Sequence, residues 1–292
     1  MKKIKKILTI IVIIIAIIIA IIIIKKIANP IDMFRSSNYN SKSIYVYNIT
    51  DDKEVLGINE NKRLYPASLT KIMTVTVALD CINNLSDMVS IDIDSYRELI
   101  NENSSMAGFY GGETVTYRDL LYGAILESGG ECAETLAVNL GGDRKSFVDK
   151  MNDKSRQIGL KDTNFRNPTG LDEKDQYSTA KDICMLIKSS LKDGNFRAIF
   201  TKEEYTSIQT EDHPNGVYMQ STVLKKLKDK NLENFTIIGG KSGTTNEAGR
   251  CWATLAIKNN KEYVVVVMGA QMDNNDGEEG QIIDTIKILS EI

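Results

Sequence analysis

The sequence predicts a mixed α/β fold, of the α+β kind, in which one antiparallel sheet is built from both ends of the chain and a helical lobe is inserted between them. Two observations carry this prediction. Residues that favour strands gather before residue 59 and again after Asn234, whereas apolar residues recur at helical spacing through most of the segment between them. Strands from distant parts of a chain pair in one sheet when they enclose the same core.

The chain begins with a strongly apolar segment that is bounded by lysines. Residues 7–24 read ILTIIVIIIAIIIAIIII, which is 18 residues without a charge and long enough to span a bilayer. Four lysines precede it and two follow, and this asymmetry keeps the N-terminus in the cytoplasm. A cleaved signal peptide is the alternative, but no small-x-small cleavage site follows. We therefore expect residues 1–26 to be a cytoplasmic stub and a single-pass anchor in the cell membrane, residues 27–42 to be a tether, and residues 43–292 to form an extracytoplasmic domain.

The composition of the exported part argues against two kinds of site. Once the six lysines around the apolar segment are set aside, 30 of the 36 basic residues remain against 39 acidic residues, a net charge of −9, and no basic patch suggests nucleic acid. Zinc is not expected, because the chain has one histidine and no cysteine pair at ligand spacing. Disulfides are possible in an exported domain, but Cys81 and Cys184 lie in apolar helical contexts and Cys251 in a strand-like one, so buried free thiols are expected.

The first half of the domain is predicted to be a hairpin followed by helices. Residues 43–49 alternate in polarity, the segment DDKE then turns, and VLGIN completes the hairpin. A helical pattern runs from Ser68 to Cys81. Four further helical segments follow within an inserted lobe that spans about residues 82–191: TYRDLLYGAILESGG, ECAETLAVNLGG, SFVDKMNDKSRQIGL and TAKDICMLIKSSLK. Paired glycines suit the end of the second segment, and a loop with Pro168 and Gly170 separates the last two.

The end of the chain returns to strands. FTIIGGKSGTT, GRCWATLAIKNN and KEYVVVVMGAQ are predicted to be three strands joined by short turns, and QIIDTIKILSEI closes the chain as a helix. The cleft between the sheet and the helical lobe is where we expect a site.

A serine and a lysine near the start of the first long helix could form a nucleophile. Ser68 and Lys71 lie three residues apart in YPASLTKIMTV, so on a helix they share a face and the amine can hydrogen-bond the hydroxyl. Partial burial at the positive end of a helix lowers the pKa of a lysine. The neutral amine can then accept the serine proton without any histidine. Alone the pattern is weak, because a capping serine followed by a surface lysine has the same spacing.

Two later stretches strengthen this interpretation. ESGGE holds Ser128 at a turn between predicted helices, and GGKSGTT holds Lys241, Ser242 and Gly243 on a predicted strand. With SLTK they resemble the S-x-x-K, S-x-N and K-[ST]-G signature of the penicilloyl serine transferases, the fold group of penicillin-binding proteins and class A β-lactamases. Within that group the chain is similar to the low-molecular-weight D-alanyl-D-alanine carboxypeptidases. Five stretches follow the order of that family: YPASLTKIMT, LLYGAILESGGECAETLA, MNDKSRQIGLKDTNFRNPTGLD, YSTAKD and GGKSGTTNEAG.

The resemblance implies a β-lactamase/transpeptidase-like fold and a serine-type carboxypeptidase. Such an enzyme removes the terminal D-alanine from peptidoglycan stem peptides, takes β-lactams as covalent inhibitors and uses no metal or organic cofactor. By the same resemblance, Ser68 would form the acyl-enzyme, Lys71 would be its general base, and Ser128 would relay a proton to the leaving amine.

The resemblance also assigns the substrate contacts on the K-S-G strand. Lys241 and Ser242 would bind the region of the terminal carboxylate, and Gly243 would let the strand approach the substrate. The backbone N–H groups of Ser68 and Thr244 would form the oxyanion hole. Like-charge repulsion between Lys71 and Lys241 would lower the pKa of the second lysine of this pair.

Two of the departures from the family pattern concern site residues. Gly130 stands where the family has an asparagine, whose amide helps to hold the catalytic lysine and hydrogen-bonds the substrate backbone. A water or a neighbouring side chain such as Asn246 could replace that amide. The family's arginine shortly after the last strand has no counterpart in GAQMDNNDGEE. Arg250, nine residues after Lys241, is the candidate that would bind the terminal carboxylate by a forked contact, and a solvated strand arginine is the other interpretation.

Other functions remain open at this stage. A class A β-lactamase would need a glutamate-activated water, but Glu173 in the comparable loop lacks the E-x-x-L-N pattern. A catalytically weak protein that binds penicillin or cell-wall peptides is favoured only by Gly130. A transpeptidase is a further alternative, less favoured because the sequence shows no second domain that would position a strand acceptor.

Overall fold

The structure is a computed structural model that describes residues 39–272 and 279–292. From Asn40 onward these residues belong to one compact unit with its own core. The expected anchor, residues 1–26, and residues 27–38 of the tether lie outside the described residues. No helix in the described ranges has the length and apolar composition of a membrane span.

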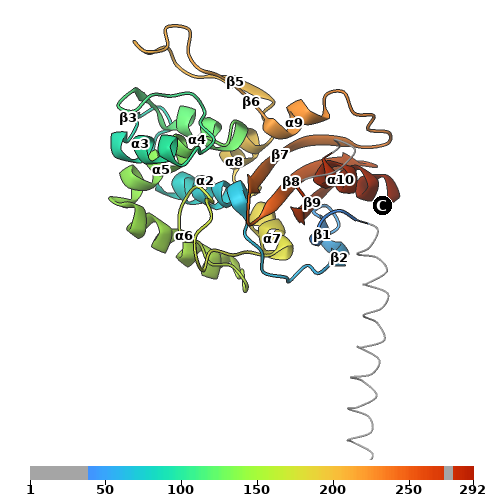
Figure 1. Ribbon diagram of the computed structural model, residues 1–292. Coiled ribbons are helices and arrows are strands. Elements are labelled where there is room, and N and C mark those ends of the chain that lie inside the picture. The colour runs from blue at the N-terminus through green and yellow to red at the C-terminus, as the bar shows by residue number, and fades with distance from the viewer. Residues whose placement is uncertain (1–38, 273–278) are drawn as a thin grey trace, which may run out of the picture. The chain divides into compact units, whose positions relative to one another are not determined.

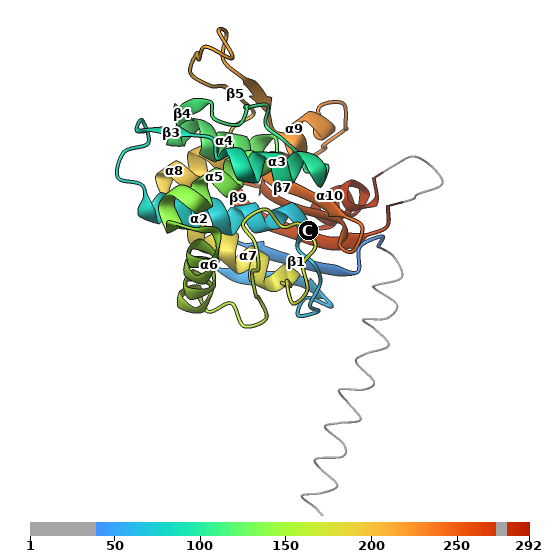
Figure 2. The ribbon, with the colours of Figure 1, turned by 60° about the vertical axis from the view of Figure 1, so that its left-hand side comes forward.

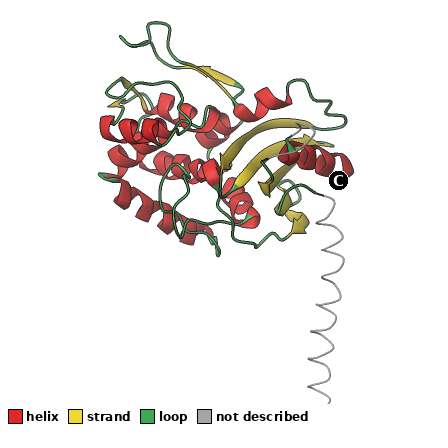
Figure 3. Cartoon of the chain, in the orientation of Figure 1, coloured by secondary structure: helices red, strands yellow, loops and turns green. Residues whose placement is uncertain are grey.

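One five-stranded antiparallel sheet organises the unit, in the order β2-β1-β9-β8-β7 (Figures 1 and 3). The hairpin from the start of the unit pairs with the last strand, because Val46 of β1 lies opposite Val265 of β9. This confirms the prediction of one antiparallel sheet built from both ends of the chain. Its strands are β1 (Ser43–Asn48), β2 (Lys53–Ile58), β7 (Thr236–Thr245), β8 (Gly249–Lys258) and β9 (Lys261–Ala270).

The central strand β9 is buried on both faces, which explains its unbroken valine run. Val264 and Val266 belong to the main core, and successive side chains on a strand alternate, so Val265 and Val267 face the other side. Two helices pack on β9, namely α7 (Ala180–Ser190), which also contacts β1, and α10 (Gly280–Glu291), which also contacts β8.

The helices of the inserted lobe surround α2 (Thr70–Cys81) (Figures 1 and 2). This helix begins directly after the short helix η1 (Ala67–Leu69). Every residue of α2 from Thr70 to Ala78 is buried. A helix that is enclosed on all sides needs no amphipathic pattern, and this one contacts helices from all four predicted segments of the lobe and one more. The helices around it are α4 (Tyr117–Leu126), α5 (Gly130–Gly141), α6 (Arg144–Ile158), α7 and α8 (Gly194–Phe200).

Several short elements had no clear sequence signal. The helix α3 (Ile93–Asn101) packs on α5. Two small hairpins and one short helix complete the described fold: β3 (Met88–Ser90) with β4 (Thr114–Thr116), β5 (Glu204–Thr206) with β6 (Tyr218–Gln220), and α9 (Thr222–Leu227). The four cysteines carry free thiols, three of them buried and Cys81 partly so, as predicted.

Candidate active site

The serine and lysine of the first motif meet at the junction of η1 and α2. Lys71 Nζ lies 3.1 Å from Ser68 Oγ and also donates a hydrogen bond of 2.7 Å to the backbone carbonyl of Thr169. The lysine side chain is 2% exposed, whereas Ser68 is half-buried. The structure therefore brings the predicted nucleophile and base within hydrogen-bond reach, with only the serine open to a ligand.

Burial lowers the pKa of Lys71 to about 8, although the negative charges of Glu131 and Glu134 act in the opposite direction. An appreciable fraction of this amine is neutral near neutral pH. The Thr169 carbonyl takes one N–H, so the lone pair of the neutral amine can face Ser68. The arrangement can withdraw the proton of the hydroxyl.

A second lysine is buried beside the first. Lys241 on β7 is fully buried, and its Nζ donates a hydrogen bond of 2.8 Å to the carbonyl of Ser242. Burial and then the charge of Lys71 lower the pKa of Lys241 well below its usual range, and Glu127 partly opposes this. The like-charge repulsion expected from the sequence therefore acts on Lys241.

The predicted proton relay occupies a strained turn. Ser128 lies between α4 and α5, is 6% exposed and has a φ of +65°. Ala67, directly before the nucleophile, has a φ of +48°. Residues other than glycine seldom adopt this left-handed region, and when they do, the surrounding structure holds them there, often at active sites. The neighbouring Glu127 accepts the backbone N–H of Gln220 at 2.6 Å, which ties this turn to β6.

Two glycines let backbone segments close on the nucleophile. A Cβ atom at Gly243 would lie 2.8 Å from the backbone nitrogen of Ser68, so β7 passes directly against η1. A Cβ at Gly170, whose φ is +87°, would lie 1.9 Å from the carbonyl oxygen of Ala67. Close contact at these two points needs glycine. The loop that presents Thr169 to the lysine is thus pressed against the residue before the serine.

The remaining predicted contacts lie along β7 and β8. Ser242 Oγ is 2.8 Å from Thr222 Oγ1 on α9, and Thr244 is exposed. Arg250 is half-buried and lies directly opposite Thr244 in the β7–β8 ladder, so the two side chains share one face of the sheet.

The position that lacks the family asparagine is packed by another segment. The backbone N–H of Gly130 donates to the carbonyl of Ser105 at 2.7 Å, and a Cβ at Gly130 would lie 2.6 Å from Ser104 Oγ. Asn246 is instead exposed at the turn between β7 and β8, where it lines a groove with Lys42. The polar side chain beside Gly130 is therefore Ser104, which belongs to no motif recognised in the sequence.

A buried carboxylate that sequence reasoning missed holds this segment. Glu131 Oε1 accepts the backbone N–H groups of Ala107 and Gly108 at 2.6 and 3.0 Å. Burial raises the pKa of Glu131. The order of residues could not reveal this role, because the contact joins α5 to a loop more than 20 residues earlier.

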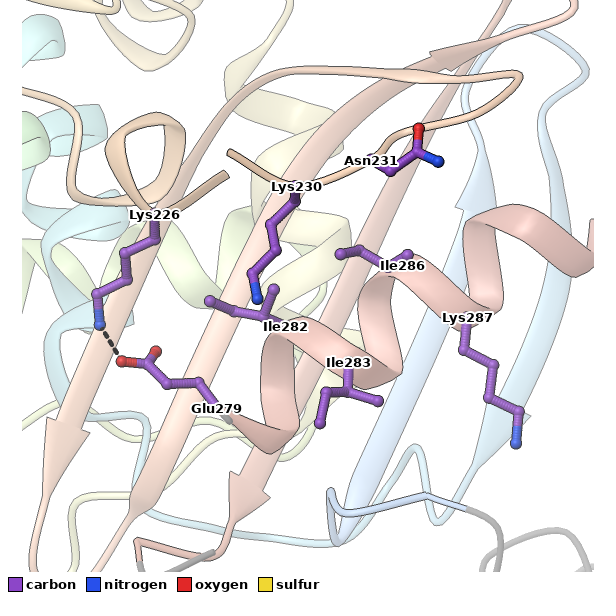
Figure 4. Close-up of a pocket in the computed structure, with 8 residues that line it drawn as sticks. All are labelled: Lys226, Lys230, Asn231, Glu279, Ile282, Ile283, Ile286 and Lys287. Carbon is purple, nitrogen blue, oxygen red and sulfur yellow. Dashed lines mark hydrogen bonds and ion pairs between the residues drawn. The ribbon is translucent and has the colours of Figure 1, made fainter. Parts of the chain in front are cut away.

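Two cavities differ in their relation to these residues. One of about 210 Å³ extends from Leu99, beside Gly130, to Thr169, whose carbonyl accepts a hydrogen bond from Lys71. Another, of about 500 Å³, lies between α10 and the end of α9 with the segment that follows it, and none of the predicted site residues lines it (Figure 4). In the described part of the chain, no group of three or more histidine, cysteine or acidic side chains is placed to hold a metal ion.

Comparison with known proteins agrees with this geometry. The profile of the peptidase S11 family, described as D-alanyl-D-alanine carboxypeptidase, matches residues 31–272. The chain is 30% identical over 237 residues to D-alanyl-D-alanine carboxypeptidase DacF of Bacillus subtilis, covering 80% of this chain and 58% of that protein. It is 35% identical over 219 residues to D-alanyl-D-alanine carboxypeptidase DacA of Haemophilus influenzae, covering 73% and 52% respectively. The chain thus spans somewhat more than half the length of these relatives.

A solved structure extends the likeness to the fold. The crystal structure of the Streptomyces K15 DD-transpeptidase superposes with a TM-score of 0.76 at 26% identity, and the match covers 87% of this chain and 98% of that one. The family match and the fold agree, and the chain belongs to the peptidase S11 family of D-alanyl-D-alanine carboxypeptidases.

Proposed function

We propose that this protein is a membrane-anchored, extracytoplasmic serine carboxypeptidase that removes the terminal D-alanine of peptidoglycan stem peptides and is acylated by penicillin. The observation that carries the proposal is the buried Lys71 amine, 3.1 Å from Ser68 Oγ with a pKa lowered to about 8. The family membership supplies the substrate class. The apolar segment of residues 7–24 supports the anchor.

In the acylation step, neutral Lys71 accepts the proton of Ser68, and Oγ attacks the carbonyl carbon between the two D-alanines. The backbone N–H groups of Ser68 and Thr244 stabilise the oxyanion. When the tetrahedral intermediate collapses, the peptide bond breaks and the leaving amine takes a proton through Ser128 from the lysine. The products are free D-alanine and a Ser68 ester of the shortened peptide.

In the deacylation step, water attacks this ester and gives up a proton to Lys71, and the proton returns to Oγ as the serine leaves. The substrate carboxylate would lie against the hydroxyls of Ser242 and Thr244, with Lys241 buried behind them and Arg250 opposite Thr244. A charged hydrogen bond at that point orients the scissile bond over Ser68.

A transpeptidase is the second candidate, because the Streptomyces K15 structure carries that name. An amine acceptor would then take the acyl group in place of water. A class A β-lactamase has less support. Glu173, the carboxylate in the comparable loop, accepts a hydrogen bond from Asn167 and pairs with Arg166, and a backbone carbonyl contacts the lysine.

The test uses residues 27–292 and a Ser68→Ala control. Each is incubated with diacyl-L-Lys-D-Ala-D-Ala, with and without an added amine acceptor, and D-alanine and any transfer product are measured. Release of D-alanine by the protein with Ser68 and not by Ser68→Ala, with hydrolysed peptide as the main other product, supports the carboxypeptidase. Dominant transfer product favours the transpeptidase. A folded protein that labels with fluorescent penicillin but releases no D-alanine contradicts both.

A further inference from the structure

The loop of residues 104–108 is fastened to the first turn of α5, directly after the Ser128 turn. Three hydrogen bonds join them: the backbone N–H of Gly130 donates to the carbonyl of Ser105, and the backbone N–H groups of Ala107 and Gly108 donate to the side-chain carboxylate of Glu131. Because backbone groups of the loop make all three bonds, its side chains have defined positions relative to α5.

The two glycines of the S-G-G motif are what allows this approach. A Cβ at Gly129 would lie 2.8 Å from the Cβ of Ala107, and a Cβ at Gly130 would lie 2.6 Å from Ser104 Oγ and 3.1 Å from a methyl carbon of Leu99. The space that a side chain at position 130 would occupy is therefore filled by another residue.

The distance of the hydroxyl matches that of the group it displaces. In an asparagine, standard bond lengths place the amide oxygen and nitrogen about 2.4 Å from Cβ. Ser104 Oγ stands 2.6 Å from the Cβ position of residue 130. A hydroxyl can both donate and accept, as the two ends of an amide do. The serine therefore offers a similar group at a similar distance, carried by a different segment of the chain.

The hydroxyl is free for a ligand. Ser104 is half-buried, and its hydroxyl makes no hydrogen bond to any residue within 39–272 or 279–292. It touches the Gly130 site that also borders Leu99, and the cavity beginning at Leu99 ends at Thr169, the partner of Lys71. The backbone N–H of Ser104 donates to the carbonyl of Leu99 at 3.0 Å, so the serine is bonded to a residue that lines this cavity.

We propose that Ser104 positions the substrate: its hydroxyl hydrogen-bonds the stem-peptide backbone on the acyl side of the scissile bond, in place of the side chain that Gly130 lacks. The proposal rests on the proposed function for the identity of the peptide. It requires that loss of the Ser104 hydroxyl weakens binding of the peptide. Loss of the hydroxyl of Ser105, an exposed neighbour that contributes only its carbonyl, should leave binding unchanged.

The first experiment measures binding without turnover. In a Ser68→Ala background, residues 27–292 are titrated with diacyl-L-Lys-D-Ala-D-Ala by calorimetry, with Ser104→Ala and Ser105→Ala added separately. Removal of one uncharged hydrogen bond should weaken binding about three- to tenfold for Ser104→Ala only. Equal binding by the three proteins, or absence of binding by all, overturns the proposal. This arm is independent of D-alanine release, so the proposed function can fail while Ser104 is still judged.

The second experiment exchanges the two side chains. In the active protein, Gly130→Asn should lower acylation by fluorescent penicillin at least tenfold, because the new side chain meets Ser104 Oγ. Combined with Ser104→Gly, the same asparagine has room and can supply its own amide, so acylation should return to within about threefold of the starting protein. A double variant no better than Gly130→Asn, with unfolding temperatures matched among the proteins, contradicts the proposal.

Discussion

The backbone carbonyl of Thr169 accepts a hydrogen bond of 2.7 Å from Nζ of Lys71, although 98 residues separate the two in the chain. The contact fixes the amine beside Ser68 with a neutral partner. No carboxylate among the described residues hydrogen-bonds this amine, so nothing in direct contact offsets the cost of burying its charge. This relationship explains why the pKa of Lys71 falls to about 8.

Acylation should therefore rise with pH. Only the neutral amine accepts the Ser68 proton, so the rate of labelling by fluorescent penicillin should increase nearly tenfold per pH unit below about pH 8 and level off above it. Lys71→Arg keeps a positive charge at every accessible pH and should abolish labelling throughout. A flat profile between pH 6 and 10 would rule out Lys71 as the base.

The Thr169 contact depends on Gly170, and a matched glycine isolates this dependence. Gly170 and Gly159 both have a φ of +87°, but a Cβ at Gly170 would meet the Ala67 carbonyl at 1.9 Å, whereas a Cβ at Gly159 would meet nothing within 4 Å. Gly159→Ala should cost about 1–2 kcal/mol of unfolding free energy from backbone strain alone and leave acylation unchanged.

Gly170→Ala should cost more and also slow acylation at least tenfold, because the loop must move and take the Thr169 carbonyl with it. Urea unfolding and penicillin labelling of both variants check this. Equal losses of stability, with equal labelling rates, would show that the close approach at Ala67 has no role in catalysis.

Arg250 should affect substrate binding more than turnover. Its place opposite Thr244 puts it beside the part of β7 that is expected to hold the terminal carboxylate. Loss of a charge-assisted hydrogen bond in Arg250→Ala should raise KM for D-Ala-D-Ala peptides at least tenfold and change kcat less than threefold. Arg250→Lys keeps the charge but not the forked contact, so its KM should lie between those of the starting protein and the alanine variant. An unchanged KM in the alanine variant would leave Arg250 as a surface residue of the strand.

The parts of this site that could be predicted from the sequence are those that are local in the chain. Ser68 and Lys71 lie within one helical turn. The strands and helices could be predicted because apolar residues recur along each of them at the spacing typical of that element. Contacts that join distant segments were not accessible. The Thr169 carbonyl is a backbone group without a residue signature, and Ser104 is one of many loop serines.

Asn246 is the side chain that was suggested, besides a water, as a replacement for the missing asparagine. It lies exposed at the turn beyond the end of β7, in a groove with Lys42. A loop that precedes α5 by about 25 residues reaches the glycine instead, because hydrogen bonds to Glu131 fold it back.

The buried Lys71 should also make the stability of the protein depend on pH. In the unfolded chain the pKa of a lysine is near 10.5, and in the folded protein that of Lys71 is about 8. Between these pH values the unfolded state binds more protons, so this group makes the folded protein more stable as pH rises from 8 to 10.5, and its cost is fully present below pH 8.

Lys71→Met removes this pH-dependent cost, although it leaves the Thr169 carbonyl without its partner at every pH. The stability of the variant relative to the starting protein should therefore decline by about 3 kcal/mol as pH rises through this interval, since one pKa unit corresponds to about 1.4 kcal/mol. Urea unfolding of residues 27–292 at pH 7, 8, 9 and 10 measures the difference. Lys145, an exposed lysine whose pKa is raised by Asp149, supplies the control, because Lys145→Met should show no such decline. A constant difference for Lys71→Met would mean that the amine is charged in the folded protein across the whole range, and Lys71 could not then act as the base.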